Sequence, residues 1–154
     1  MSRRGTYALV MSLPRGRKIR IGALGTFEFR AGHYVYLGSA LNGLDVRVAR
    51  HLASVSQREL PPEWQRREIG RRLSGRRPKK VFWHIDYFLR YARVLQVWTD
   101  ATGERLECRW ARTVLALPNA RVLAPRFGAS DCDCAAHLIF LDRSQATSKS
   151  DHDV

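Results

Sequence analysis

The sequence predicts a mixed α/β (α+β) domain with a small antiparallel sheet, and three observations lead to this prediction. The first third of the chain contains short apolar segments separated by Gly, Pro and Asn, which is typical of β-strands and turns. The rest contains longer segments in which apolar residues recur at helical spacing. The length of 154 residues is sufficient for a single hydrophobic core.

Four strands are expected in the first third of the chain, and they lie in segments 6–13, 19–21, 27–29 and 34–38. Pro14-Arg15-Gly16 follows the first segment and is a turn signal. Because the strands follow one another with only short connections, they predict a β-meander.

Three helical segments and two further strands are expected in the rest of the domain. Segment 44–57 follows the Asn42-Gly43 turn and carries the apolar stripe Leu44, Val48, Leu52 and Val55. Segment 104–117 carries the stripe Leu106, Trp110, Val114 and Leu117. The other expected elements are a helix over 81–91 and strands over 93–99 and 136–141, with a loop after Pro118-Asn119. Residues 1–142 are predicted to form one domain, and residues 143–154 to form a disordered tail without apolar periodicity.

The charge balance indicates a polyanionic partner. The formal net charge is +13, the isoelectric point is about 10.8, and 23 of the 27 basic residues are Arg. Because the guanidinium fork suits bidentate phosphate contacts, we expect nucleic acid ahead of a membrane surface. A bias toward arginine codons can explain the Arg/Lys ratio, but it does not explain the excess of positive charge.

A basic insertion is expected over residues 58–80, where nine basic and three acidic residues leave a charge of +6 in 23 positions. Pro61-Pro62 can open a short helix within it. The segment is interpreted as a surface that follows nucleic-acid phosphates, and a solvated charged face is the alternative. Its candidate nucleic-acid-binding residues are Arg58, Arg66, Arg67, Arg71, Arg72, Arg76, Arg77, Lys79 and Lys80.

The expected compartment is the cytoplasm. No apolar run approaches the roughly 18 residues of a membrane span. The apolar run over 5–13 resembles a strand more than a signal peptide, because it is short and lacks a clear cleavage site. The three cysteines are an odd number, which favours reduced thiols over a disulfide framework.

Two pairs of residues can support phosphodiester chemistry. Arg47 and His51 are four apart, so they project from one face of the predicted helix. A guanidinium can stabilise a phosphate, and an imidazole can accept a proton or orient a phenol. Tyr7 and Tyr36 lie on predicted strands, and a nearby arginine or metal ion can lower the pKa of a tyrosine. The alternatives are two solvated helix residues and two strand tyrosines with hydroxyls at the sheet rim.

Glu107 is the fifth candidate. It shares a helical face with Ala111 and Val114, so its carboxylate lies at the edge of the predicted core. A carboxylate there must be paired, bind a cation or reach solvent. With phosphate oxygens and waters, a single carboxylate suits Mg²⁺. A salt bridge to a local arginine is the alternative.

Two further groups of potential ligands are interpreted as structural. Cys132, Cys134 and His137 can supply three zinc ligands, with Cys108 or Asp131 as a fourth. Their C-x-C spacing does not match the usual C-x₂₋₄-C of structural sites, so small buried thiols in a tight turn are expected and zinc is not. His84 and Asp86 are two apart and are expected to cap the helix or bond the adjacent loop. Asp86 as a second metal-site carboxylate is the minor alternative.

These residues resemble the GIY-YIG nuclease superfamily. Gly5-Thr6-Tyr7 matches its first motif and Tyr36-Leu37-Gly38 its second, so Gly5 and Gly38 are the motif glycines. Arg47 matches the helix arginine, His51 the residue one turn later, and Glu107 the metal-binding glutamate of a later helix.

The resemblance is closest to the DUF123 subgroup and extends from residue 5 to about 141. Besides the two motifs, the matching segments are 32–40, Trp83-His84-Ile85-Asp86-Tyr87, Glu107-Cys108, 127–134 and His137-Leu138. In this resemblance the gap of 29 residues between Tyr7 and Tyr36 is unusually long, and residues 15–32 are interpreted as an inserted β-hairpin.

The resemblance implies a small central three-stranded antiparallel sheet flanked by helices, and an endonuclease that hydrolyses DNA at one Mg²⁺ or Mn²⁺ ion. In that scheme Tyr7, assisted by Tyr36 or His51, helps to activate water. Arg47 stabilises the phosphate and Glu107 holds the metal. We therefore expect these five residues to converge on one solvent-open concavity. The alternatives are a non-catalytic nucleic-acid-binding module that retains the fold, and an accessory protein with a protein partner.

Overall fold

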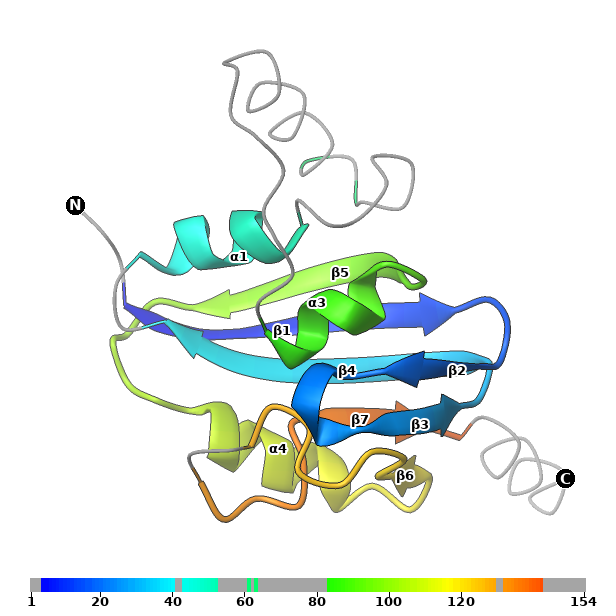
Figure 1. Cartoon of the computed structure of the whole chain (residues 1–154). Helices are drawn as coiled ribbons and strands as arrows, with labels where there is room; N and C mark the ends of the chain where they lie inside the picture. Colours follow the sequence, from blue (N-terminus) through cyan, green and yellow to red (C-terminus); the bar gives the residue numbers. More distant parts are fainter. Residues whose placement is uncertain are drawn as a thin grey trace, which may run out of the picture.

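The structure is a computed structural model that describes residues 4–40, 43–52, 61, 63, 83–129 and 132–142, without the side chains of Asp45 and Val46. It is a mixed α/β fold with a mainly antiparallel sheet and few helices (Figure 1). The strands are β1 (Gly5–Leu13), β2 (Arg17–Arg20), β3 (Thr26–Phe29), β4 (Gly32–Ala40), β5 (Arg93–Asp100), β6 (Ala120–Arg121) and β7 (Leu138–Leu141). The helices are α1 (Leu44–Leu52), α3 (His84–Leu89) and α4 (Glu107–Leu115), with a short 3-10 turn, η1, over Gly22–Leu24.

The main sheet has five strands in the order β5-β1-β4-β7-β6, and every neighbouring pair is antiparallel. The main sheet therefore has more strands than the three that were expected. The sheet gains β7, which was predicted as a strand, and β6, which was predicted as a loop. A two-residue strand carries no periodicity of its own, so only pairing with β7 defines β6.

The predicted β-meander is wrong, because β1 does not pair with the next strand in the sequence. It pairs with β4, and the register places Tyr7 opposite Gly38 and Leu9 opposite Tyr36. Strands β2 and β3 form a separate two-stranded sheet between them, so the inserted hairpin is present (Figure 1). Because the hairpin lies outside the main sheet, β1 and β4 pair directly. The two tyrosine motifs, which are distant in sequence, therefore lie on neighbouring strands.

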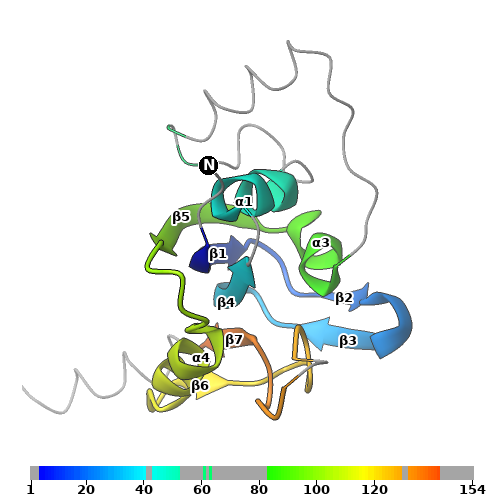
Figure 2. The same ribbon diagram turned by 90° about the vertical axis from the view of Figure 1, so that its left-hand side faces the viewer.

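Each face of the sheet has its own hydrophobic cluster and its own helix layer (Figure 2). Because side chains alternate along a strand, Tyr7 and Leu9 face one side while Ala8 faces the other. Helices α1 and α3 cover the face with Tyr7, through buried residues such as Val48 and Phe88. Helix α4 covers the opposite face, where Ala111 packs in one cluster with Ala8, Val35, Leu37 and Ile139.

The apolar stripe predicted for α1 is confirmed over the described residues, where Leu44, Val48 and Leu52 are at most 1% exposed. The helix is described to Leu52, and the fourth member of the stripe, Val55, lies outside the described residues. The amphipathic pattern thus directs one face of α1 onto the sheet and leaves Arg50 exposed.

The stripe predicted for α4 is confirmed in part, because Trp110 and Val114 pack against the hydrophobic cluster on that face of the sheet whereas Leu117 does not. The buried residues of the helix are Glu107 and Ala111, whereas Trp110 and Val114 are half-buried and Leu117 lies past its end at 47% exposure. The small side chain of Ala111 allows the helix to approach the sheet closely. The helix therefore places Ala111 at the centre of its contact with the sheet, and the larger Trp110 and Val114 pack beside it while remaining half-buried.

Several predictions fall outside the described residues. They are the nine basic residues of segment 58–80 and the tail over 143–154. Among the helices that the structure does describe, none is both long enough and apolar enough to cross a membrane.

Candidate active site

The two motif tyrosines meet on one face of the sheet. Tyr7 projects from β1 and Tyr36 from β4, and their ring centroids are 6.2 Å apart. His51, from the last turn of α1, completes the group with its ring 5.7 Å from Tyr7 and 6.4 Å from Tyr36. Three candidate residues that are distant in sequence therefore form one aromatic cluster, which we call the Tyr-Tyr-His cluster.

The motif glycines are required because other groups occupy the space of a side chain. A Cβ on Gly38 would lie 2.4 Å from both Cζ and Oη of Tyr7. A Cβ on Gly5 would lie 1.8 Å from the carbonyl oxygen of Asp100 on the neighbouring strand. Gly38 thus lets the Tyr7 ring lie over β4, and Gly5 lets β5 pair closely with the start of β1.

A buried carboxylate holds the histidine of the cluster. Nδ1 of His51 lies 3.1 Å from Oδ1 of Asp86, and the two side chains are 1% and 0% exposed. The second carboxylate oxygen of Asp86 accepts a hydrogen bond from the backbone N–H of Trp83 at the start of α3. Because a carboxylate only accepts, this geometry places a proton on Nδ1 of His51 and fixes the orientation of its ring.

Arg47 lies one turn before His51 on α1 and is half-buried beside the cluster. Its Nη1 donates to the carbonyl oxygen of Ser39 at 3.3 Å, and its guanidinium carbon lies 4.7 Å from the centre of the Trp83 ring. A guanidinium held by a stacking ring and a carbonyl is pre-oriented, which suits recognition of a phosphate.

The environment of Tyr7 keeps its phenol protonated. Burial raises the pKa of Tyr7 well above its usual value of 10, and the neighbouring Tyr36 and Asp86 act in the same direction. Arg47 lowers that pKa, but by less than burial raises it. The phenol of Tyr7 is therefore protonated at physiological pH.

The cluster is not the solvent-open concavity that we expected. Tyr7 and His51 are each 1% exposed and Tyr36 is 7% exposed. Their rings contact the hydrophobic core that also includes Leu52 and Phe127. Of the five candidates, Arg47 is the one that combines a place beside the rings with partial exposure to solvent.

Glu107 does not join the Tyr-Tyr-His cluster. It lies in the first turn of α4, one turn before Ala111, and α4 covers the face of the sheet opposite Tyr7 (Figure 2). Its Oε1 accepts hydrogen bonds from Nη2 and Nε of Arg105 at 3.0 and 3.3 Å. Its Oε2 is buried and has no hydrogen-bond partner among the described residues. The expectation that all five residues converge is therefore wrong as far as Glu107 is concerned, because a strand's alternation separates the two faces.

Glu107 and Arg47 nevertheless lie at the same end of the sheet. Arg47 bonds the carbonyl of Ser39, and Ser39 is the β4 partner of Thr6. The hydroxyl of Thr6 accepts the backbone N–H of Leu106 at 2.8 Å, directly before Glu107. Arg47 and Glu107 are thus linked through the paired residues Ser39 and Thr6, at the end of β4 and the start of β1. Arg47 lies on one face of the sheet and Glu107 on the other.

His84 and Asp86 have the structural roles that their spacing predicts. Nδ1 of His84 accepts the backbone N–H of Gly128 at 2.9 Å, which ties α3 to the loop before β7. Burial lowers the pKa of His84. Asp86 caps α3, but its contact with His51 was missed. No local pattern indicates a contact between residues 35 apart, so only the packing of α1 against α3 reveals it.

These features define a mixed α/β domain with a buried tyrosine–histidine–aspartate group beside an arginine at one end of its sheet. Comparison with known families assigns the chain more narrowly. The family described as domain of unknown function DUF123 matches residues 6–153, and the chain belongs to this family. Searches of curated proteins and of solved structures found no match.

Proposed function

We propose that this protein is a metal-dependent endonuclease of the GIY-YIG type, which hydrolyses phosphodiester bonds in DNA. The observation that carries the proposal is the packing of Tyr7, Tyr36 and His51 with ring centroids 5.7–6.4 Å apart. The two motifs are 29 residues apart in the sequence, yet the inserted hairpin leaves their strands paired. The net charge of +13 supports a nucleic-acid substrate.

Arg47 binds the scissile phosphate in this proposal. Its guanidinium is half-buried and close enough to the cluster to lower the pKa of Tyr7, and it can stabilise negative charge that develops on the phosphate oxygens. The Trp83 ring and the Ser39 carbonyl hold it in one orientation.

His51 and Tyr36 share the proton transfer. Because Asp86 holds Nδ1 of His51 in its protonated form, Nε2 is the basic nitrogen of the ring. It can accept a proton from water or from Tyr36, whose ring packs beside it. Tyr7 stays protonated and orients the group through hydrogen bonding, since burial raises its pKa.

Glu107 is the proposed ligand of the Mg²⁺ or Mn²⁺ ion. The buried Oε2, which has no hydrogen-bond partner in the described part of the chain, fits this role, because leaving a carboxylate oxygen unsatisfied costs free energy that a cation would recover. One carboxylate with waters and phosphate oxygens is a suitable donor set for Mg²⁺. When bound, such an ion neutralises the charge on the leaving oxygen. The substrate would pass over the end of the sheet where Thr6 and Ser39 pair, with Arg47 on one face and Glu107 on the other.

The test is cleavage of plasmid, single-stranded and branched DNA with Mg²⁺ or Mn²⁺. We expect the Arg47→Ala variant to lose on the order of 100-fold in rate, as when one charge-stabilising group is removed. Arg50→Ala is the matched control, because Arg50 is an exposed arginine on the same helix. Cleavage of none of these substrates, or equal loss in both variants, would contradict the proposal.

A non-catalytic nucleic-acid-binding module is the second candidate. The nearly complete burial of Tyr7, His51 and Asp86 favours it, because buried groups can serve the fold alone. It predicts binding that weakens steeply with salt and is unaffected by Arg47→Ala, without strand scission. For both candidates we propose the cytoplasm as the compartment, on the basis of the three unpaired cysteines.

A further inference from the structure

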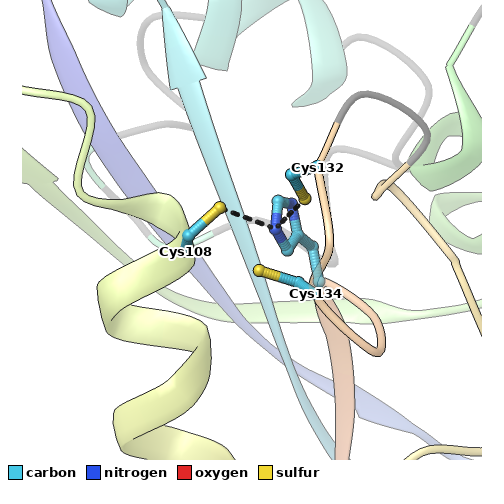
Figure 3. A group of neighbouring side chains, drawn as sticks. Cys108, Cys132 and Cys134 are labelled. Carbon is cyan, nitrogen blue, oxygen red and sulfur yellow. Dashed lines mark hydrogen bonds between the residues drawn. The ribbon is translucent and has the colours of Figure 1, made fainter.

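All three cysteines of the chain gather at one point on the face of the sheet that α4 covers. Cys108 lies in the first turn of α4, and Cys132 and Cys134 lie in the loop before β7 (Figure 3). His137, at the end of the same loop, adds an imidazole and is 4% exposed. The four ligand atoms all lie within 4.8 Å of one another.

These separations fit a tetrahedral zinc ion. With Zn–S bonds of about 2.3 Å and Zn–N bonds of about 2.0 Å, a tetrahedron has S···N edges of about 3.5 Å and S···S edges of about 3.8 Å. The sulfur of Cys132 lies 3.5 Å from Nε2 of His137, and that of Cys108 lies 3.8 Å from the same atom. Three thiols and one imidazole are a donor set typical of closed, structural zinc sites.

The backbone around the ligands is held in place. The N–H of His137 donates to the carbonyl of Phe127 at 2.7 Å, and its own carbonyl accepts the N–H of Leu37 on β4 at 3.0 Å. Arg126 donates from its backbone N–H to Ala135 and from Nη1 to the carbonyl of Cys134, at 2.7 and 2.8 Å. A ligand loop with these bonds is pre-organised, which is the condition that a specific metal site needs.

Burial disfavours ionisation of the thiols of Cys108 and Cys134. Burial raises the pKa of Cys108 to about 12, and its neighbours Cys134 and Cys132 contribute. Burial also raises the pKa of Cys134, while the hydrogen bond with Cys108 and, to a smaller extent, the nearby Arg112 lower it. A divalent cation reverses this balance, because each thiol then loses its proton to solvent and binds as a thiolate.

We propose that Cys108, Cys132, Cys134 and His137 bind one structural zinc ion. The C-x-C spacing alone does not predict zinc, because the local cysteine pairs of structural zinc sites usually have the spacing C-x₂₋₄-C. Here Cys108 comes from a helix 24 residues earlier in the sequence, and the sheet brings it opposite the loop. All four coordination positions are filled by the protein, so the ion holds the fold together and takes no part in catalysis.

Zinc at this place would join α4 to the loop before β7. Helix α4 and this loop each lie next to a residue of the candidate active site. Cys108 follows Glu107 directly, and Phe127, whose carbonyl bonds the backbone of His137, has its ring 6.2 Å from Tyr36. The site is nevertheless independent of the nuclease proposal, since its ligands belong to neither the Tyr-Tyr-His cluster nor the carboxylate of Glu107.

The first test uses the full-length protein with its natural sequence, purified under reducing conditions without added chelator. We expect elemental analysis to find one zinc ion per chain. We also expect titration of the thiols with an organomercurial to release that ion as the three cysteines react. After removal of the metal, addition of Co²⁺ should produce the ligand-field spectrum of a tetrahedral thiolate site. Metal-free protein with three freely reactive thiols and no cobalt spectrum would overturn the proposal.

The second test compares variants by metal content and thermal unfolding. Cys108→Ser, Cys134→Ser and His137→Ala should each lose bound zinc and unfold at a lower temperature. Asp133→Ala is the matched control, because this exposed residue lies between two ligands and is not one itself. It should retain zinc. Full zinc content in all three ligand variants would also overturn the proposal, whereas absence of nuclease activity in the zinc-loaded protein would not.

Discussion

His51 and Asp86 form a buried pair, with Nδ1 of His51 3.1 Å from Oδ1 of Asp86. The pair connects α1 to α3 across the face of the sheet that carries the two motif tyrosines. The pair affects both the stability of the fold and the protonation of the candidate site, because the carboxylate that caps α3 also determines which nitrogen of His51 is protonated.

Asp86→Asn should therefore destabilise the protein. An amide presents its oxygen to only one of the two donors, so either His51 or the Trp83 N–H loses its acceptor. We expect the free energy of unfolding in urea to fall by about 3 kcal/mol. Asp133→Asn, an exposed aspartate, should change it by less than about 0.5 kcal/mol. Equal stability of the two variants would show that the His51–Asp86 contact does not contribute.

Gly38→Ala should displace the Tyr7 ring. The new methyl group would lie 2.4 Å from the phenol, and a buried ring has little space into which it can rotate. We expect a loss of about 2 kcal/mol in the free energy of unfolding, as for other overpacked cores.

The control for that prediction is a double-mutant cycle with Tyr7→Ala, which removes the ring. In that background, Gly38→Ala should cost much less than in the natural protein. Additive effects of the two substitutions would mean that the conflict lies with the strand backbone and not with Tyr7.

Glu107→Gln should separate function from stability. The carboxylate is buried with one unsatisfied oxygen, so removing its charge should leave the free energy of unfolding unchanged or raise it by about 1 kcal/mol. Metal-dependent cleavage should be lost. Glu104→Gln is the control, because Glu104 is a nearby exposed acid. A marked loss of stability in Glu107→Gln alone would indicate a structural ion pair with Arg105 instead.

Acidification should weaken the tie between His84 and Gly128. Burial lowers the pKa of His84 below its usual 6.5, so the unfolded chain binds a proton more readily than the folded one. The contribution to stability is therefore present above pH 6.5 and is lost as the pH falls through the lower, folded-state pKa. His84→Asn keeps an acceptor near the position of Nδ1 but does not titrate. The difference in unfolding free energy between the two proteins should be constant above pH 6.5. At lower pH the natural protein should lose stability relative to His84→Asn.

The difference in unfolding free energy between the natural protein and His84→Asn isolates the effect of His84, because both proteins carry the same cysteine and histidine cluster and share its response to acid. A difference that does not vary between about pH 7.5 and about pH 5.5, roughly one unit either side of the ordinary histidine pKa, would rule out this role for His84.

The sequence by itself determined the strands β1, β4, β5 and β7 and the apolar face of α1. These elements follow from alternation and helical spacing, which depend on neighbouring residues alone. It also identified Tyr7, Tyr36 and His51 as partners, because their motif context carries that information without a structure.

The tertiary structure alone decided what depends on pairing across the sheet. Local periodicity cannot specify that β1 pairs with β4 or that β6 exists. The strand's alternation then placed Tyr7 and Glu107 on opposite faces. The same sheet brought Cys108 to Cys132, Cys134 and His137, since contacts between distant residues arise only when the chain packs.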